Sequence, residues 1–476
     1  TKERELPPLP GAVQGKVVTR LPPEPSKYNH LGHALSFLIN VVYAKRYDGK
    51  VILRFEDTNP EKVNQEYVDA MLQDIVEYLG IRPAEIRFVS DDMEQLLEYA
   101  TRIIDMGEAY MCFCPREQVA QFREKMKECP CRGNEKSHHM AEWTKFQAGV
   151  YMKGEGVLRL KGDMTSQNTV LRDPVLYRAV SAPHFRLGNK YHVWPLYDFY
   201  NPIEDALCGV THIMRSNEFE LRVPLHRRIK ELLALPEQEV LQYGRLNING
   251  AVTQGREIRA LIESGQYLGW DDPRLVTLRA LRRRGIKAEA FWELVNQLGL
   301  SPHPVSLDFS MLAAINRKLI ENTSRYSFVE DPVEFVIEDA QPKEVTLDLH
   351  PDRKGGRTLQ ANTRYLLAKP DVDLITGKKV RLMGLLTAEE KNGTLTLIAY
   401  EQQKKGHDLV VNWLPAEPEQ SVAVTVMMPD AEEKTGRAEK NITSLKINDI
   451  VQFERFGFCR LDAIENGIYK FWYTHK

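Results

Sequence analysis

Residues 16–60 read KVVTRLPPEPSKYNHLGHALSFLINVVYAKRYDGKVILRFEDTNP, and this stretch decides the fold of the region around it. Short apolar runs bounded by proline and glycine predict buried strands, whereas apolar residues three and four positions apart predict helices. The two patterns alternate here. The predicted elements are a strand at 16–20, a helix through 35–47, a strand at 51–55 and a helix through 68–79. This βαβα order predicts a multidomain α/β protein that begins with a doubly wound, Rossmann-type parallel sheet.

Length and composition predict several domains. The chain has 476 residues, of which 43% are apolar and 27% charged, and one core does not accommodate so many. The longest apolar runs, such as Val422–Met428, are far shorter than a bilayer requires, and no secretory signal is recognisable. We therefore expect a soluble, cytoplasmic protein without membrane contact. Residues 1–15 are expected to be an N-terminal stub outside the fold.

The net charge does not point to a nucleic-acid partner. Because the formal net charge is −2, a nucleic acid would have to be held by local basic patches. The candidate patches are 279–284 (RALRRR), 353–357 (RKGGR) and Lys404-Lys405. A solvated charged face explains any one of them equally well.

The periodic pattern changes further along the chain. A cysteine-bearing insert interrupts it from about residue 110 to 172. Strand-like alternation at 191–196 and 210–215 then predicts that the sheet resumes, and a helical stretch follows from 256 to about 320. After Pro332 short β runs alternate with glycine turns, which predicts all-β barrels at the C-terminus.

The sequence His30-Leu31-Gly32-His33 lies where the first strand and its proline-rich turn lead into a helix. The N-terminus of a helix attracts anions through its free N–H groups and its dipole, and two imidazoles add donors suited to a polyphosphate. Gly32 would let a flat purine lie against the main chain. A pair of histidines near a helix start can also be incidental, and this alternative stays open at this point.

Four of the six cysteines form two CxC pairs, Cys112 with Cys114 and Cys129 with Cys131. Thiolates at this spacing can close one tetrahedral Zn²⁺ site that leaves no open position for a substrate. The alternatives are four reduced buried thiols, or disulfides in a secreted protein. The expected intracellular location disfavours disulfides.

A set of ordered sequence blocks resembles the class I glutamyl- and glutaminyl-tRNA synthetases. These enzymes carry PPEPSG, HIGH and LRF(D/E)DTNP blocks in this order, and the resemblance spans nearly the whole chain. The block at 451–458 is similar to the barrel domain of archaeal and eukaryotic members, so the chain most resembles the archaeal glutamyl type. The matching blocks are RLPPEPS at 20–26, HLGH at 30–33, LRFEDTNP at 53–60, VWPLYDF at 193–199, THIMR at 211–215, GWDDPRL at 269–275 and VQFERFGF at 451–458.

The resemblance implies roles for individual residues. An acidic substrate needs guanidinium groups for its carboxylates and an acidic group for its ammonium, and the implied pocket offers both. A surface ion-pair network is the alternative reading of these charges. The implied amino-acid pocket contains Arg20, Glu56, Tyr197, Asn201 and Arg215. The implied ATP site contains Glu24, Pro25, Ser26, His30, Gly32, His33, Arg245 and Leu246, with His30 and His33 also catalytic.

Two positions depart from the family pattern. Lys27 replaces the glycine that follows PPEPS. The second family signature, KMSKS, corresponds here to Val252–Glu257 (VTQGRE), in which Gly255 takes the place of the phosphate-binding lysine. Arg256, one residue further, is the catalytic candidate that would supply the missing positive charge.

The resemblance implies a ligase that activates L-glutamate with ATP and Mg²⁺ and transfers it to tRNA-Glu, with tRNA-Gln left open as a second acceptor. A structural Zn²⁺ completes the expected cofactors, and a monomer is favoured. A glutaminyl enzyme is the alternative within the family, but such enzymes generally lack a cation at the position of Arg215. A catalytically weakened tRNA-binding paralogue is the alternative from a different class.

The resemblance also divides the chain into expected domains. They are the N-terminal stub at 1–15, the first half of the Rossmann catalytic domain at 16–110, an inserted acceptor-end-binding domain with the zinc site at 111–174, the second half of the catalytic domain at 175–235, an ATP-loop and helical stem-contact domain at 236–335, and β-barrel anticodon-binding domains at 336–476.

Overall fold

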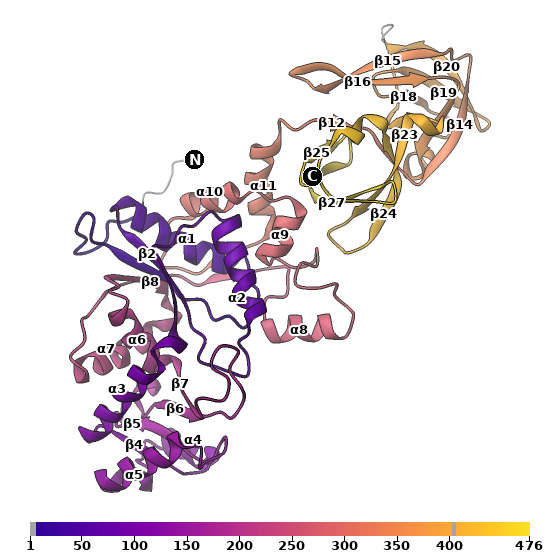
Figure 1. The fold of residues 1–476 in the computed structure, drawn as a ribbon. Coiled ribbons are helices and arrows are strands. Elements are labelled where there is room, and N and C mark those ends of the chain that lie inside the picture. Colours follow the sequence, from indigo (N-terminus) through magenta and orange to yellow (C-terminus); the bar gives the residue numbers. More distant parts are fainter. Residues whose placement is uncertain (1–5, 402–405) are drawn as a thin grey trace. The chain divides into compact units, whose positions relative to one another are not determined.

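The computed structural model describes residues 6–401 and 406–476, and Figure 1 shows it as a ribbon. The basic pair Lys404-Lys405 lies outside the described residues. The chain divides into two compact units, Thr1–Asn249 with Phe291–Asp308 and Gly250–Ala290 with Phe309–Lys476. No described helix combines the length and the apolar character that crossing a bilayer demands.

The predicted βαβα order is confirmed and forms the centre of the first unit. β1 and β2 pair in parallel with Arg20 opposite Ile52, and β3 continues the sheet on the far side of β2. α1 buries its apolar face against these strands. Beside β1, β8 pairs in parallel with β9, and the Thr211 hydroxyl accepts from the Val18 N–H. The bounds are β1 Val18–Leu21, α1 Leu31–Arg46, β2 Lys50–Phe55, α2 Gln65–Leu72, β3 Glu85–Phe88, β8 His212–Ser216 and β9 Glu239–Tyr243.

The insert is an antiparallel sheet, and its strands extend beyond the predicted range of 111–174. The strand predicted at 191–196 does form, as β7, but it pairs antiparallel with β6 and so belongs to the insert. The prediction that this strand resumes the parallel sheet is wrong. The second predicted stretch, 210–215, forms β8, which pairs in parallel with β9 as a two-stranded sheet beside β1. Alternation along one strand reveals a strand but not its partner. The bounds are β4 Ala109–Cys112, α4 Arg116–Glu124, α5 Lys136–Gln147, β5 Val157–Leu160, β6 Val175–Ala179 and β7 Val193–Pro195.

Three helices outside the insert share one apolar core with α5 and the strands of the insert. Trp143 and Trp194 are fully buried in this core, together with side chains from each of the three helices. Burial of such large side chains fixes the helices against the sheet, because each contributes about 150–250 Å² of buried surface. The helices are α3 Met93–Asp105, α6 Tyr197–Leu207 and α7 Val223–Leu232.

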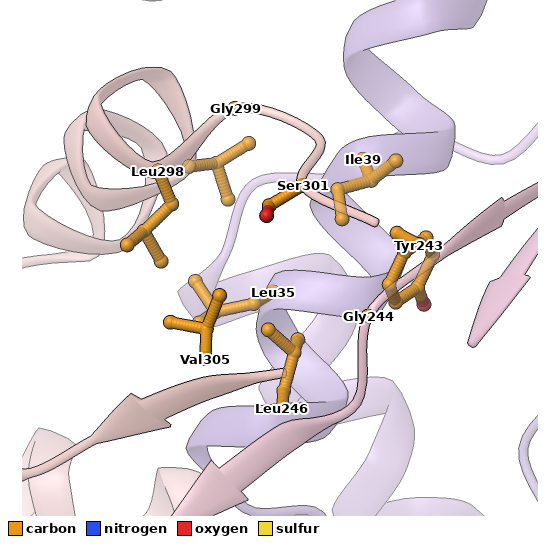
Figure 2. A pocket seen from close by; sticks show the side chains of 10 residues that line it. Leu35, Ile39, Tyr243, Gly244, Leu246, Leu298, Gly299, Ser301 and Val305 are labelled. Carbon is orange, nitrogen blue, oxygen red and sulfur yellow. The ribbon is translucent and has the colours of Figure 1, made fainter. Parts of the chain in front are cut away.

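The segment after β9 packs against the helix that follows the HLGH motif. Leu246 faces an apolar pocket together with Leu35 and Ile39 of α1 (Figure 2). The Tyr243 hydroxyl donates to Ser36 Oγ at 2.8 Å. These contacts tie the strand after Tyr243 to α1. The elements around the pocket are β10 Leu246–Ile248, α10 Ala288–Leu298 and β11 Val305–Leu307.

Residues 6–15, expected to be outside the fold, pack against the end of α1. The Tyr43 hydroxyl donates to the Pro7 carbonyl at 2.8 Å, and Leu9 is 5% exposed. The described part of this segment therefore belongs to the first unit. A proline-rich stretch without periodicity carries no sequence signal for such packing.

The second unit contains helices followed by two seven-stranded sheets, each around its own apolar core. The β-rich C-terminal region is confirmed, but its strands begin at Arg325, and residue 336 falls inside a strand. The first strand has two residues, which is too short for a visible alternation. The bounds are α8 Gly255–Glu263, α9 Leu278–Arg284, α11 Phe309–Ile320, β12 Arg325–Tyr326, β13 Phe328–Glu330, β14 Pro332–Glu338, β15 Lys343–His350, β16 Arg353–Ala361, β17 Arg364–Ala368, α12 Lys369–Val372, β18 Lys379–Leu382, β19 Leu386–Lys391, β20 Thr394–Tyr400, β21 Leu409–Val411, β22 Trp413–Pro415, β23 Ser421–Met427, β24 Glu433–Glu439, β25 Ile450–Phe453, β26 Gly457–Glu465 and β27 Ile468–His475.

In two of the basic clusters seen in the sequence, one arginine forms an ion pair within the second unit. Arg283 forms an ion pair with Asp462 at 2.9 Å. Arg357 is 1% exposed and pairs with the buried carboxylate of Glu439 at 2.6 Å. These two cations hold the unit together, so neither patch offers all of its charge to a nucleic acid.

Candidate active site and candidate metal site

His30 and His33 stand at the N-terminus of α1 and are fixed by reciprocal hydrogen bonds. His30 Nδ1 accepts from the Gly32 N–H at 3.0 Å, and His33 Nδ1 accepts from the His30 N–H at 3.0 Å. A neutral imidazole that accepts at Nδ1 carries its proton on Nε2. Burial, with a smaller effect of Lys27, lowers the pKa of His30 to about 4, and burial also lowers the pKa of His33. At neutral pH both rings are therefore uncharged Nε2–H donors.

The turn before α1 lies at the carboxyl ends of β1 and β2. The Glu56 N–H, directly after β2, donates to the Pro23 carbonyl at 2.9 Å, and the Ser26 N–H donates to the Glu24 carbonyl at 2.8 Å. Glu24 is exposed, whereas Pro25 and Ser26 are buried. In open parallel sheets, ligands bind at the carboxyl ends of the strands. The predicted ATP-site residues of this turn are therefore at the edge of the sheet where a ligand is expected.

Gly32 is required by the ring beside it. A Cβ atom at this position would lie 2.9 Å from His30 Cε1. Because that ring is held by hydrogen bonds at Nδ1, it cannot easily move away. The structure thus gives a local reason for the glycine, in addition to the close approach of a purine expected from the sequence.

One face of α6 contacts the predicted amino-acid pocket. Positions 197, 201 and 205 are four residues apart and share this face. The Tyr197 hydroxyl accepts from Arg215 Nη1 at 3.4 Å, and Asn201 Nδ2 lies 3.4 Å from both carboxylate oxygens of Glu56. The structure thus gathers the predicted pocket residues in one cluster: Arg20, Glu56, Tyr197, Asn201 and Arg215.

Sequence reasoning missed two charged residues of this cluster, Arg54 and Asp205. Asp205 Oδ1 accepts from Arg20 Nε at 3.0 Å and from Arg54 Nη1 at 2.8 Å, and Arg54 Nη2 lies 3.7 Å from Glu56. Burial alone would raise the pKa of Asp205, but the two guanidinium groups hold it well below its usual range. The repeated four-residue spacing of Tyr197, Asn201 and Asp205 along α6 was the signal that could have found Asp205.

Burial acts on two further carboxyl groups. Burial raises the pKa of Glu56 to about 7, against the opposing effect of Arg54, and raises the pKa of Glu204 to about 9. Glu204 is therefore protonated at neutral pH, while Glu56 titrates near neutrality. When Glu56 is ionised, three guanidinium groups face two carboxylates. The cluster then has one net positive charge, which suits a ligand with one net negative charge.

Arg215 contributes the uncompensated part of this charge. Arg215 is 6% exposed, and no carboxylate of the described residues lies within ion-pair distance of its guanidinium group. The Nε–H is buried without a hydrogen-bond partner. A buried charge without a counter-ion is strongly unfavourable. Arg215 therefore marks the position where an anionic group of a ligand would be stabilised most.

Arg245 and Leu246 have different environments. Arg245 is exposed, with Nε 3.8 Å from the Glu218 carboxylate. The Leu246 side chain faces the apolar pocket behind α1 (Figure 2). Leu246 thus packs the strand against the helix of the HLGH motif.

Gly255 and Arg256 are the first two residues of α8, in the second unit. The residue before them, Gln254, makes no side-chain cap hydrogen bond, so the first N–H groups of α8 lack a capping side chain. Gly255 is buried and Arg256 is exposed. A helix start of this kind, with an arginine beside it, can bind a phosphate.

The four predicted metal ligands lie together in the first unit. Their sulfur atoms are all within 4.8 Å of one another, and the distances from Cys112 to Cys129 and from Cys114 to Cys131 are both 3.8 Å. In a tetrahedral site with Zn–S bonds of about 2.3 Å, two sulfurs are about 3.8 Å apart. A disulfide needs about 2.0 Å, and all four thiols are free. The donor set therefore fits a closed tetrahedral metal site.

Sequence comparison places this architecture in a family. Residues 16–322 match the family "tRNA synthetases class I (E and Q), catalytic domain". Residues 323–397 and 410–462 match its "anti-codon binding domain" families. The chain belongs to the class I glutamyl/glutaminyl-tRNA synthetase family.

Curated relatives are similar over the whole chain. The glutamate–tRNA ligase of Pyrococcus furiosus is 40% identical, and the match covers 100% of this chain and 85% of the relative. The glutamate–tRNA ligase of Thermococcus kodakarensis is 39% identical over 97% of this chain and 83% of its own. The corresponding enzyme of Methanosphaera stadtmanae is 35% identical over 100% and 85%.

Proposed function

We propose that the chain is a glutamate–tRNA ligase. In the first step, an α-carboxylate oxygen of glutamate attacks the α-phosphorus of ATP, which forms glutamyl-adenylate and releases pyrophosphate. In the second step, a hydroxyl of the 3′-terminal ribose of tRNA attacks the activated carbonyl and releases AMP. The similarity to three glutamate–tRNA ligases, 35–40% identical over 97–100% of this chain, supports the proposal.

The observation that carries the choice of substrate is the charge of the buried cluster. Glutamate has two carboxylates and one ammonium, so its single net negative charge cancels the excess charge of the cluster. Glutamine is neutral and would leave a guanidinium group buried without a counter-ion. We assign the second substrate carboxylate to Arg215 and the ammonium to Glu56. This disfavours the alternative of a glutaminyl enzyme.

The HLGH motif supplies donors for the nucleotide. The Nε2–H groups of His30 and His33, together with the start of α1, would stabilise negative charge that develops on the phosphates during attack. Because both rings are neutral, their contribution is hydrogen bonding rather than charge. Mg²⁺ bound with ATP shields the triphosphate. The protein thus acts by positioning and charge stabilisation, without a covalent intermediate of its own.

The altered second signature is the reason to consider a weakened paralogue. Gly255 offers no side-chain cation, but the start of α8 presents main-chain N–H groups, and Arg256 adds a charge beside them. We assign phosphate binding to this helix start. Glutamate-dependent ATP–pyrophosphate exchange in the presence of tRNA separates an active enzyme from a paralogue that only binds tRNA.

The cysteine cluster is proposed to hold one structural Zn²⁺. Cys112, Cys114, Cys129 and Cys131 fill all four positions, so the metal would stabilise the insert and contact no substrate. It would link the end of β4 and the residue two positions beyond it to the segment 129–131. We assign the insert to the acceptor end of tRNA, and the β-rich sheets after Arg325 to the anticodon arm.

An aminoacylation assay tests the proposed function. Purified tRNA-Glu and tRNA-Gln are each offered glutamate and glutamine with ATP and Mg²⁺. We expect glutamate to be attached to tRNA-Glu, and the same assay shows whether tRNA-Gln also accepts it. Attachment of glutamine in preference to glutamate, or no attachment of either to any tRNA, would contradict the proposal.

A further inference from the structure

Arg159 lies directly behind the inner pair of cysteines. It is on β5, opposite Tyr110 of β4, and its side chain has no exposed surface. Its Nη1 donates to Cys112 Sγ at 3.8 Å and to Cys129 Sγ at 3.6 Å. These two sulfurs are buried, whereas the sulfurs of the outer pair are on half-buried residues. The arginine therefore reaches the part of the cluster that water reaches least.

The charge of Arg159 has no carboxylate partner. Its Nε donates to the main-chain carbonyl of Asp173 at 2.8 Å, while the Asp173 carboxylate pairs with Arg132 at 3.0 Å and accepts from the Tyr110 hydroxyl at 2.8 Å. Among residues 6–401 and 406–476, no carboxylate is within ion-pair distance of Arg159, and its Nη2 is buried without a partner. Burying a guanidinium group in this way is unfavourable unless the sulfurs are anionic.

A zinc ion with four thiolates has two net negative charges, and in a buried site these need compensation. We infer that Arg159 is a charge-compensating residue of the metal site: its guanidinium group donates to the sulfurs of Cys112 and Cys129 and thereby raises the affinity for zinc. The inference rests on the proposed zinc site. Groups that hydrogen-bond to metal ligands typically change metal affinity about 10- to 100-fold when they are removed.

Arg159→Met, Arg159→Gln and Arg159→Lys test this role, with Arg172→Met as the matched control. Arg172 is a buried arginine of the same insert, 7% exposed, but it donates to the main-chain carbonyls of Ser166 and Arg123. Zinc affinity is measured on the full-length protein by competition with a chromogenic chelator. The cobalt-substituted protein reports the tetrahedral thiolate site by its absorption spectrum, independently of activity.

We expect Arg159→Met and Arg159→Gln to weaken zinc binding about 10- to 100-fold, and Arg159→Lys to recover part of the loss. Arg172→Met is expected to remain within about threefold of the wild type in zinc affinity, since it loses packing but no contact to sulfur.

Unchanged zinc affinity in the Arg159 variants would overturn the inference while leaving the zinc site intact. An equal loss in Arg172→Met would also overturn it, because general loosening of the insert would then explain the effect. A wild-type protein that binds no zinc would overturn the zinc site itself. If Arg159→Met does not fold, the zinc affinity of Arg159→Gln, which keeps an N–H donor but no charge, tests the inference instead.

Discussion

Substitution of Arg215 tests whether its guanidinium group selects the substrate. Arg215→Cys removes the buried cation that has no carboxylate partner and leaves the cluster without its excess positive charge. Loss of a charge-assisted contact in a desolvated pocket costs about 2–5 kcal/mol, which corresponds to about 30-fold to several thousand-fold in kcat/KM for glutamate. Glutamine forms no such contact and should lose far less. The assay is aminoacylation of one tRNA with each amino acid.

The same substitution has an expected effect on stability that separates selection from a structural role. Because Arg215 is a buried charge without a counter-ion in the free protein, its removal should leave the melting temperature unchanged or raise it. Arg228→Cys is the control, since Arg228 is half exposed and lies 3.7 Å from Glu108. It should change neither the melting temperature nor the preference for glutamate by much. Equal losses for glutamate and glutamine in Arg215→Cys, with a lower melting temperature, would refute the reasoning.

Three further outcomes are expected. Protein purified without added zinc should contain about one zinc per chain, measured by elemental analysis; absence of zinc from a folded insert with four free thiols would contradict the site. The KM for glutamate should rise as the pH falls below about 7, by up to about tenfold per pH unit, because burial raises the pKa of Glu56 and the substrate ammonium needs its ionised form. Glu56→Gln should abolish this pH dependence of KM; a variant that keeps the wild-type pH profile would rule out Glu56 as the titrating group. The raised pKa also means that Glu56 favours folding at acid pH, and that this contribution to stability is lost as the pH rises through about 7. Arg357→Met should destabilise the second unit by about 3–5 kcal/mol in denaturant unfolding, because Glu439 is then buried without its cation, and adding Glu439→Leu should recover most of the loss; no loss in the single variant would show that the pair is not needed.

The local elements of the catalytic region were predictable because their signals are local. Apolar spacing identified α1 and both flanking strands, and the strand–turn–helix context pointed to His30 and His33. The neutral state of the two rings was not predictable. It depends on burial and on the Nδ1 hydrogen bonds, which exist only once the turn and the helix start are assembled.

Strand partnership and domain limits were harder to predict, for a physical reason. The alternation that gave β7 is the same in a parallel and an antiparallel sheet, so it could not show that β7 pairs with β6. The two-residue strand at Arg325 is too short to show any period, and the predicted limit of 336 was late for that reason. Pairing energy comes from segments distant in sequence, and a single sequence does not display it.

A buried arginine with an unused N–H donor lies at each of the two proposed anion sites, and only one of these arginines, Arg215, was predicted from the sequence. Among the described residues, four arginines less than 9% exposed have no carboxylate within ion-pair distance. Two of them, Arg172 and Arg284, donate to main-chain carbonyls, and none of their N–H groups is buried without a partner. The other two, Arg159 and Arg215, each retain such an N–H group. One lies against the thiols of the proposed metal site and the other in the proposed glutamate pocket. A buried cation with an unused donor costs stability in the free protein. Its position is best explained by negative charge that is present once a ligand has bound: the thiolates of the zinc-loaded site for Arg159, and the substrate carboxylate for Arg215.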